Sequence, residues 1–219
     1  MTDEPIQLVI FDLGRVLIRL CDGWQHAAKL AGVTRLPCEV HELDEEGRAH
    51  WEKTVYRYDA GELDLHAFAR EIALHRKVDP EDVIKLQAKF LLGAYPGAKE
   101  LIHELSDRGI KTACLSNTAD SHWKQCHDPN DPNHLPMDRL TWRFASHLIG
   151  HCKPNDAIYE HVEVTTRIRP RAIMFFDDME ANVLAATKRN WRAIQVKDTS
   201  DPIQEIRVHL KEHELPIGE

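Results

Sequence analysis

Polar side chains follow several short apolar segments of the chain, at the points where strands would end. Residues 8–11 are all apolar and too few for a helix, so they indicate a strand buried on both faces, and Asp12 follows directly. In open α/β sheets ligands bind outside the carboxyl ends of the strands, so a carboxylate there is a candidate for chemistry. The later strand ends carry further candidates, which are Ser116 with Asn117, Lys153, and Asp177 with Asp178.

These groups match the needs of phosphoryl transfer, which are a nucleophile, charge neutralisation and a metal that positions the reactants. Asp12 can attack phosphorus and become an aspartyl phosphate, while Ser116 binds phosphoryl oxygens and Lys153 offsets negative charge. Magnesium prefers carboxylates, a carbonyl and waters, which Asp12, the Gly14 carbonyl and Asp178 can supply. Each group alone also has a structural explanation, as a turn, a helix start or a solvated charge.

Helices and strands alternate from residue 95 onwards, and this alternation would position the strand-end groups. Such alternation predicts an α/β fold with a doubly wound, mostly parallel, Rossmann-like sheet. The expected strands are 111–115, 146–149, 172–176 and 192–196, and the expected helices are 98–108, 154–166, a helix ending near 190, and a last helix from 201.

About seventy residues after Leu17 have helical rather than strand periodicity. Helices are expected over 22–32 and 45–58, and Asp64 and Asp79 each precede an amphipathic segment as N-cap residues. We therefore predict an inserted all-helical cap domain over residues 20–92 and an α/β core domain made of residues 1–19 and 93–219.

Composition narrows the classes of partner and environment. The chain has 219 residues, 42% of them hydrophobic, and a formal net charge of −8, which argues against nucleic acid or an anionic membrane as the main partner. The N-terminus lacks a secretory signal, and no apolar run is long enough to span a bilayer, so we expect a cytoplasmic protein. Five cysteines without a CxxC pair fit reduced thiols. Both a monomer and a homodimer remain open.

Residues 118–147 have the weakest pattern in the chain. Residues 128–133 are rich in Asp, Asn and Pro, which predicts that much of the segment is surface loop. Cys126, His127 and His134 fit no familiar zinc-ligand spacing, so we expect loop residues without a metal there.

The order of the motifs resembles that of the haloacid dehalogenase (HAD) superfamily. The matching segments are residues 11–14 (FDLG), 115–118 (LSNT), 153–154 (KP) and 176–178 (FDD), and residues 177–182 are a specific part of the likeness. The most similar subgroup is the phosphatases with a small helical cap, such as sugar-phosphate phosphatases and the N-terminal phosphatase domain of soluble epoxide hydrolases. The resemblance spans nearly the whole chain.

The resemblance implies a magnesium-dependent phosphatase that hydrolyses a small phosphate monoester, sugar phosphates being one class, through an aspartyl-phosphate intermediate. Asp12 would be the nucleophile, and residues 20–92 would close over the site and select a small phosphorylated molecule. The implied catalytic residues are Asp12, Lys153 and Ser116. The implied phosphate- or substrate-binding residues are Ser116, Asn117, Lys153 and, in the cap, Arg48. The implied Mg²⁺ ligands are Asp12, Gly14 and Asp178, with Asp177 beside them.

Gly14 departs from the pattern of the superfamily's phosphatases, which usually have a second Asp two residues after the nucleophile as the general acid and base. Losing such a group typically costs on the order of 10² to 10⁴ in rate. A backbone carbonyl at Gly14 can still bind a metal. The cap segment offers replacements for the missing acid, which are His50, Glu46, Arg48 and, just after the first strand, Asp22.

Two other functions remain open. A 2-haloacid dehalogenase uses the same nucleophile on carbon without a metal, and Gly14 favours this alternative while the acidic pair Asp177 and Asp178 disfavours it. A catalytically weakened, phosphate-binding HAD-like protein would also explain Gly14.

Overall fold

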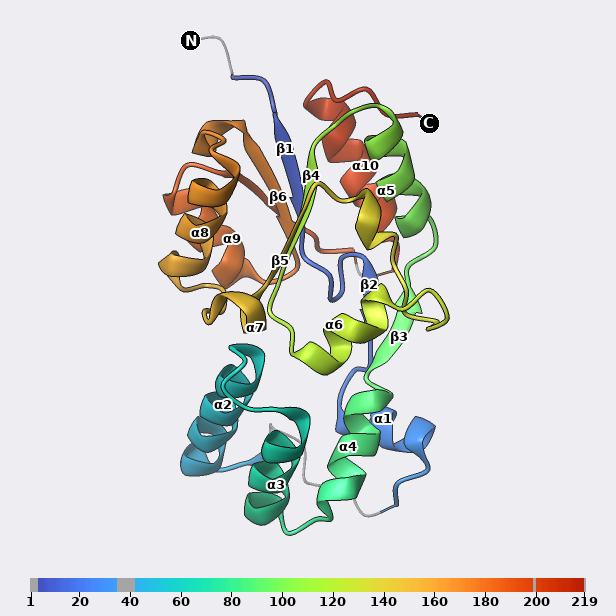
Figure 1. The fold of residues 1–219 in the computed structure, drawn as a ribbon, viewed down its shortest axis with the longest axis vertical. Helices are drawn as coiled ribbons and strands as arrows, with labels where there is room; N and C mark the ends of the chain where they lie inside the picture. Colours follow the sequence, from blue (N-terminus) through green and yellow to red (C-terminus); the bar gives the residue numbers. More distant parts are fainter. Residues whose placement is uncertain (1–3, 35–41, 199, 219) are drawn as a thin grey trace.

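A parallel sheet forms the centre of the computed structural model, which describes residues 4–34, 42–198 and 200–218 (Figure 1). The chain leaves the central strand β1 in both directions across the sheet, and all pairings in the sheet are parallel. The doubly wound α/β fold is therefore confirmed. In spatial order the strands are β5 (Trp142–Ala145), β4 (Thr112–Ser116), β1 (Leu8–Phe11), β6 (Ile173–Asp177) and β7 (Arg192–Gln195).

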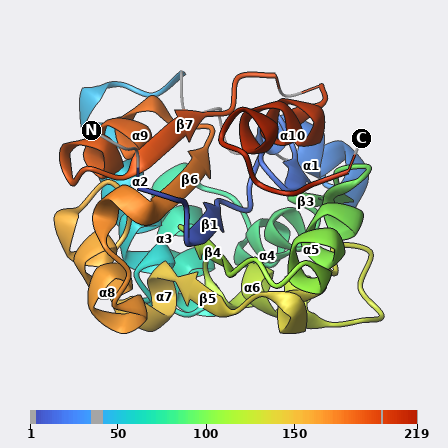
Figure 2. The same cartoon turned by 90° about the horizontal axis from the view of Figure 1, so that it is seen from above.

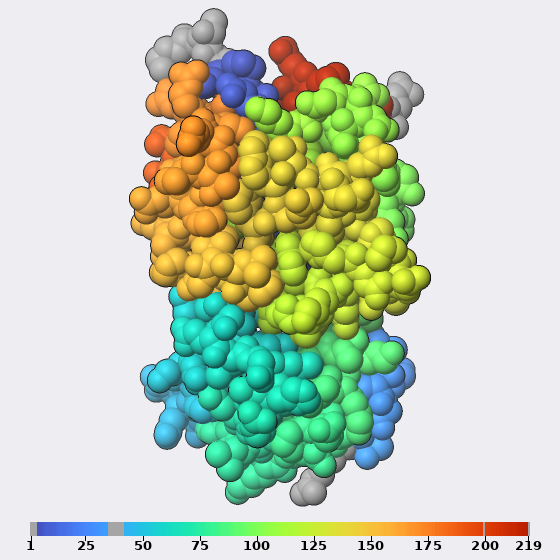
Figure 3. Space-filling model, in the orientation of Figure 1, coloured from blue at the N-terminus to red at the C-terminus, as the bar shows by residue number. Residues whose placement is uncertain are grey.

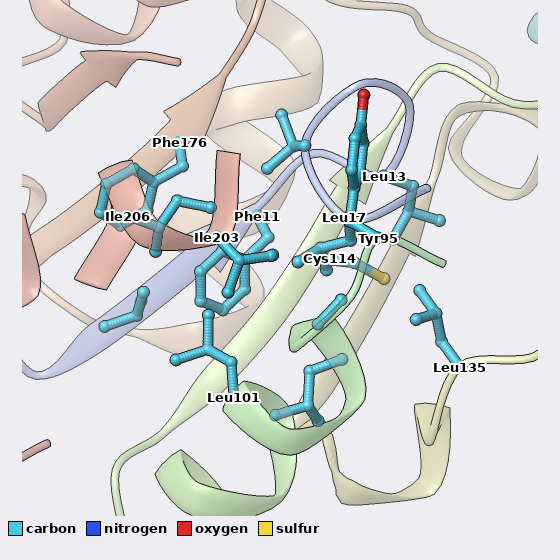
Figure 4. Close-up of a cluster of buried hydrophobic side chains, with 14 of the residues drawn as sticks. Phe11, Leu13, Leu17, Tyr95, Leu101, Cys114, Leu135, Phe176, Ile203 and Ile206 are labelled. Carbon is cyan, nitrogen blue, oxygen red and sulfur yellow. The ribbon is translucent and has the colours of Figure 1, made fainter. Parts of the chain in front are cut away.

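Helices cover both faces of the sheet, as the view from above shows (Figure 2). Side chains alternate along β1, so Phe11 packs in one buried cluster with α5 (Ala98–Asp107) and α10 (Pro202–Glu212). Ile10 packs in a second cluster with α8 (Asp156–Thr166). Figure 4 shows the first cluster, in which Phe11 lies among side chains from α5, β6 and α10. Both faces of β1 are buried, as its apolar sequence predicts.

In the described part of the chain, four α-helices lie between two short strands that pair as an antiparallel ribbon, β2 (Ile18–Leu20) and β3 (Leu91–Ala94). They have a buried cluster of their own, which includes Trp24 and Phe68. Figures 1 and 3 show them at the end of the molecule opposite the two termini. Their place in the chain agrees with an insert over 20–92, whose boundaries stay a prediction. The helices are α1 (Trp24–Ala31), α2 (Glu45–Asp59), α3 (Leu65–Arg76) and α4 (Pro80–Ala88), and we refer to them as the cap.

Two predicted helix starts are confirmed by side-chain caps. The Asp64 carboxylate accepts a hydrogen bond from Ala67 N at 2.7 Å, and Asp79 accepts one from Glu81 N at 2.9 Å. These bonds satisfy N–H groups that a helix leaves without an intrahelical partner.

The segment predicted as a loop and a weak strand differs from expectation. It contains α6 (Asp120–His127) and a 3₁₀ turn (Met137–Arg139), its strand is β5, and 146–149 is the short helix α7 (Ser146–Ile149). An edge strand of four residues is exposed on one side and has too few residues to show a period. For the same reason β2 and β3 were not predicted. Helix α8 also begins later than expected, with Asn155 as its N-cap.

The described cysteines Cys21, Cys114, Cys126 and Cys152 are free and buried, in agreement with the prediction of reduced thiols. Cys38 lies outside the described residues. Among the residues that the structure describes, no helix is both long and apolar enough to cross a membrane.

Candidate active site

Three neighbouring parallel strands bring the predicted side chains together at one edge of the sheet. Strand β1 lies between β4 and β6, so the residues that end these strands meet at their carboxyl ends. Asp12, Ser116 and Asp177 are all buried there. Lys153 joins them from the loop before α8, and its peptide bond to Pro154 is cis.

Lys153 is the charge centre of the site. Its Nζ lies 3.0 Å from Asp12 Oδ1 and 2.6 Å from Asp177 Oδ2, and it donates a hydrogen bond to the Leu115 carbonyl at 2.7 Å. Burial alone would lower the pKa of Lys153, but the two carboxylates raise it above its ordinary value. Lys153 therefore carries its charge at neutral pH and holds Asp12 in place.

Asn117 fixes the loop that carries Lys153. Its Nδ2 donates to the Lys153 carbonyl and its Oδ1 accepts from the Lys153 N–H, both at 2.8 Å. The sequence suggested a phosphate-binding role for Asn117. Because both ends of this amide are engaged with the backbone of Lys153, its geometry fits a positioning role.

Asp177 and Asp178 have different surroundings although they are adjacent. Asp177 Oδ1 accepts from Met179 N at 2.8 Å, and both of its oxygens accept from Asn182 Nδ2, at 2.9 and 3.1 Å. Asp178 is less engaged, and its Oδ2 lies 3.9 Å from Arg15 Nη1. Asp178 is therefore the carboxylate with more capacity to bind a cation.

The site holds more negative charge than Lys153 neutralises. Burial raises the pKa of Asp12 to about 7, Lys153 opposes this, and Asp177 and Asp178 add to it. Burial and the neighbouring Asp177 likewise raise the pKa of Asp178. Oδ1 of Asp12 is buried and, within the described part of the chain, accepts no hydrogen bond besides its contact with Lys153.

A hard divalent cation fits this arrangement. One oxygen each from Asp12, Asp177 and Asp178 lies within 4.8 Å of the others, and they form the one such cluster of metal-binding residue types that the described residues contain. Oxygen donors of this kind suit Mg²⁺.

Leu20 fills the place that a side chain at position 14 would take. A Cβ built on Gly14 would lie 2.9 Å from Leu20 Cδ1, closer than Cβ atoms in real proteins approach another heavy atom, so the end of the Leu20 side chain would have to shift. The φ angle of Gly14 is not positive, so its backbone would accept another residue. The obstacle to an Asp at this position is therefore the Leu20 side chain on β2.

We expect Gly14→Asp to lower the free energy of unfolding by about 1–3 kcal/mol, because Leu20 must move and a fourth carboxylate joins the site. In a Leu20→Ala background the same substitution is expected to cost less, since the steric part is gone. Urea denaturation of the wild type, both single variants and the double variant measures this coupling. Additive losses in the double variant would contradict the steric role of Leu20.

A cavity of about 210 Å³ extends from the strand ends into the cap. Its floor is formed by backbone and side chains near the strand ends, including Gly14, Ser116 and Asn117, and its roof is mostly aromatic and aliphatic. The cap contributes one carboxylate to the lining, Asp59. The roof residues are Trp24, Trp51, Val55, Tyr58, Phe68, Phe90 and Leu91.

The cap residues that the sequence offered as substrate or proton contacts lie apart from this cavity. Arg48 and Glu46 are exposed near the start of α2. The Asp22 side chain is 97% exposed, and His50 stacks on His75 with ring centroids 4.3 Å apart. Sequence reasoning missed Asp59. The signal was a carboxylate in the last turn of a helix, where the helix dipole disfavours it, directly before Ala60 and Gly61.

Two of the residues considered for a zinc site in 118–147 have other contacts. Cys126 is buried and lines the cavity. His127 Nδ1 lies 2.8 Å from the Trp123 carbonyl oxygen.

A doubly wound parallel sheet that brings a buried carboxylate, a buried lysine and an acidic pair together at one edge is typical of an enzyme site. The family model for haloacid dehalogenase-like hydrolases matches residues 6–188. The chain belongs to this family and is a HAD-like hydrolase, as its motifs predict.

Curated relatives are longer than this chain. Acyl-CoA dehydrogenase family member 10 of Mus musculus is 22% identical over 215 residues, which are 92% of this chain and 19% of that protein. Bifunctional epoxide hydrolase 2 of Rattus norvegicus is 26% identical over 121 residues, 52% of this chain and 21% of that protein. The chain therefore spans about a fifth of the length of these relatives.

Solved structures share the fold. A predicted HAD-like family hydrolase from Porphyromonas gingivalis superposes with a TM-score of 0.76 at 22% identity, covering 95% of this chain and 99% of that one. A HAD family enzyme of Bacteroides thetaiotaomicron, in complex with magnesium and inorganic phosphate, superposes with a TM-score of 0.69 at 21% identity, covering 88% of this chain and 94% of that one. L-2-haloacid dehalogenase from Xanthobacter autotrophicus, with chloropropionic acid covalently bound, superposes with a TM-score of 0.59 at 17% identity, covering 97% of this chain and 85% of that one.

Proposed function

We propose that this protein is a magnesium-dependent phosphatase of small phosphate monoesters with an apolar organic group. The observation that carries the proposal is the cluster of Asp12, Asp177 and Asp178 around a single buried lysine. Such a cluster has an excess of negative charge that a divalent cation balances, whereas an enzyme that binds an anionic substrate without a metal would be hindered by it. The magnesium and phosphate complex of the Bacteroides thetaiotaomicron enzyme supports the same reaction class.

In the proposed reaction a carboxylate oxygen of Asp12 attacks phosphorus, and the bond from phosphorus to the organic oxygen breaks. Lys153 and the Ser116 hydroxyl bind phosphoryl oxygens as negative charge gathers on them. Water then attacks the aspartyl phosphate, releasing inorganic phosphate and restoring Asp12. Held by Asp12, Asp178 and the Gly14 carbonyl, magnesium would neutralise the phosphoryl group and orient it for in-line displacement.

The lining of the cavity is the basis for the apolar substrate. Aromatic and aliphatic side chains dominate the cap side, and two of its polar groups have partners inside the protein. The Tyr58 hydroxyl is 2.7 Å from Ser121 Oγ, and His122 Nε2 is 2.9 Å from the Gln87 carbonyl oxygen. A sugar would leave most of its hydroxyls without hydrogen-bond partners here, and this unpaired burial is unfavourable.

The function is tested by phosphate release from p-nitrophenyl phosphate in the presence of Mg²⁺ and after addition of a chelator. Turnover that needs Mg²⁺ supports the proposal. Turnover that survives the chelator, or no turnover in either condition, would contradict it.

We expect kcat/KM for benzyl phosphate to exceed that for a hexose phosphate by at least tenfold, because burial of the ring contributes about 2 kcal/mol that a sugar does not gain. Trp51→Ala is expected to reduce this preference by enlarging and wetting the cavity. Leu74→Ala, at a side chain that is 85% exposed on the cap, is the control that should leave it unchanged. A preference for the hexose phosphate would show that the cavity does not select apolar groups.

A 2-haloacid dehalogenase is the second candidate, favoured by Gly14 and by the fold shared with the Xanthobacter autotrophicus enzyme. Chloride release from 2-chloropropionate, independent of Mg²⁺, would support it over the phosphatase.

A further inference from the structure

The proposed reaction leaves the organic oxygen without a proton donor. Asp12 is the nucleophile, Asp177 is engaged by Lys153 and Asn182, and position 14 has no side chain. In-line displacement places the leaving oxygen on the side of phosphorus opposite Asp12. The cavity begins at Gly14, Ser116 and Asn117 and is where the organic group would lie, so we expect the donor among its lining residues.

Asp59 is the one carboxylate among the described residues that line this cavity. It ends α2 and is half-buried, and it shares the lining with Gly14, Ser116 and Asn117 at the strand ends. The carboxylate thus belongs to the chamber that would contain the leaving group.

Contacts with the core hold this end of α2 in place. Ser146 Oγ donates a hydrogen bond of 2.5 Å to the Asp59 carbonyl. Gly61, at φ +80°, packs so closely on α7 that a Cβ there would lie 2.5 Å from the His147 carbonyl oxygen. A segment this closely fitted holds Asp59 in a defined place in the cavity lining.

We infer that Asp59 is the general acid and base of this enzyme, supplied by the cap in place of the family's second Asp; the inference rests on the proposed phosphatase function. In the first step the protonated Asp59 carboxyl gives its proton to the leaving oxygen as the phosphorus–oxygen bond breaks. In the second step the Asp59 carboxylate takes a proton from the water that attacks the aspartyl phosphate. The products are the free alcohol and inorganic phosphate, and Asp59 is again protonated.

The charge state of Asp59 suits this role. Burial raises the pKa of its carboxyl to about 7, so an appreciable fraction is protonated at neutral pH. The titratable groups near Asp59 are Tyr58 and Cys152, whose pKa values its charge affects, and His122, which shares the cavity lining; Glu62 acts on the same Cys152, and the His147 backbone lies against Gly61. Burial raises the pKa of Tyr58 and Cys152 to about 12 and lowers that of His122.

The test compares leaving groups that do and do not need a proton, in the full chain with Mg²⁺. For Asp59→Asn we expect kcat on benzyl phosphate to fall about 10²- to 10³-fold. With p-nitrophenyl phosphate, the initial burst of nitrophenol should stay within about threefold of wild type, because this group leaves without protonation. Glu52→Gln, an exposed carboxylate on the same helix, is the matched control and should change neither rate.

Two further readouts separate catalysis from structure. In the wild type, benzyl phosphate turnover should decline as the pH rises above about 7, and Asp59→Asn should lose this basic limb. The variant should also melt at a higher temperature than wild type at pH 8, because a carboxylate that is disfavoured by burial has been removed. This difference should shrink as the pH falls from about 7 towards 4, because the folded-state carboxyl takes up its proton in that range.

Equal losses on both substrates, an unchanged rate on benzyl phosphate, or a retained basic limb would overturn the role of Asp59 while leaving the phosphatase function standing. If the wild type releases no phosphate from either substrate with Mg²⁺, the proposed function itself fails and the inference with it.

Discussion

Asp12→Asn is expected to lower phosphatase turnover by about 10⁴-fold or more, the scale seen when an enzyme loses its nucleophile. The Asn amide cannot form the acyl phosphate, and Lys153 and Ser116 alone give only binding. The same substitution is expected to raise the free energy of unfolding in chelator by about 1–2 kcal/mol. Its physical reason is that the ionised Asp12 carboxyl is disfavoured by burial and by two neighbouring carboxylates, as its raised pKa shows.

Both effects can be measured on one preparation. Phosphate release gives the loss of turnover, and urea denaturation at pH 8 and pH 5 gives the stability. The folded-state pKa of Asp12 lies above the unfolded value, so the gain should be largest at pH 8 and shrink at lower pH as the wild-type carboxyl takes up its proton. Mass spectrometry of acid-quenched wild type should detect one phosphoryl group that the variant lacks. Substantial turnover in Asp12→Asn would exclude the aspartyl-phosphate route.

Lys153→Met is expected to lower the free energy of unfolding by about 3–5 kcal/mol and to abolish turnover. The substitution removes the partner of Asp12, Asp177 and the Leu115 carbonyl in a buried site, and breaking such a pair leaves uncompensated charge. The destabilisation should be smaller at pH 5 than at pH 8, because protonation of Asp12 removes part of that charge.

The control for Lys153→Met is Lys124→Met. Lys124 pairs with Asp120 at the surface, where their side chains are 75% and 61% exposed, so this substitution should change the free energy of unfolding by less than about 1 kcal/mol. Adding Asp177→Asn to Lys153→Met should cost less than the sum of the two single variants, since one unpaired carboxylate is gone. A loss below 1 kcal/mol for Lys153→Met would show that the buried pair does not organise the site.

Apolar runs and helix N-cap residues were enough to predict most of the fold. Residues 8–11 and 172–176 are predicted as strands on composition alone, and β1 and β6 confirm them with a shift of one residue in the second. Asp64 and Asp79 predict helix starts because their capping bonds are local. The error over 142–149 arose because strands of three or four residues at a sheet edge owe their existence to pairing with a neighbour, which no local pattern records.

The sequence likewise predicted some residues of the site and missed others. Asp12 and Asp177 lie at strand ends, and the topology of a parallel sheet guarantees that such positions meet. Lys153 was expected close to the end of a strand over 146–149, but that segment is helix α7, and Lys153 reaches the site from the loop before α8. The function of Leu20 and Asp59 depends on how β2 and the cap dock on the sheet. In the sequence, Asp59 is one acidic residue among many on exposed helices, and only tertiary packing distinguishes it.

The antiparallel ribbon of β2 and β3 gives the cap helices a single base of attachment in the chain, since both crossings between sheet and cap run through it. The segment it carries holds most of the roof of the cavity together with the carboxylate to which we assign proton transfer. Substrate choice and leaving-group chemistry would therefore be inherited as one module. Exchange of this segment by recombination at the ribbon would change the substrate-selecting lining and the proton donor together, while Asp12 and Lys153 would stay unchanged. New substrates could therefore arise without a change in the residues that form the aspartyl phosphate.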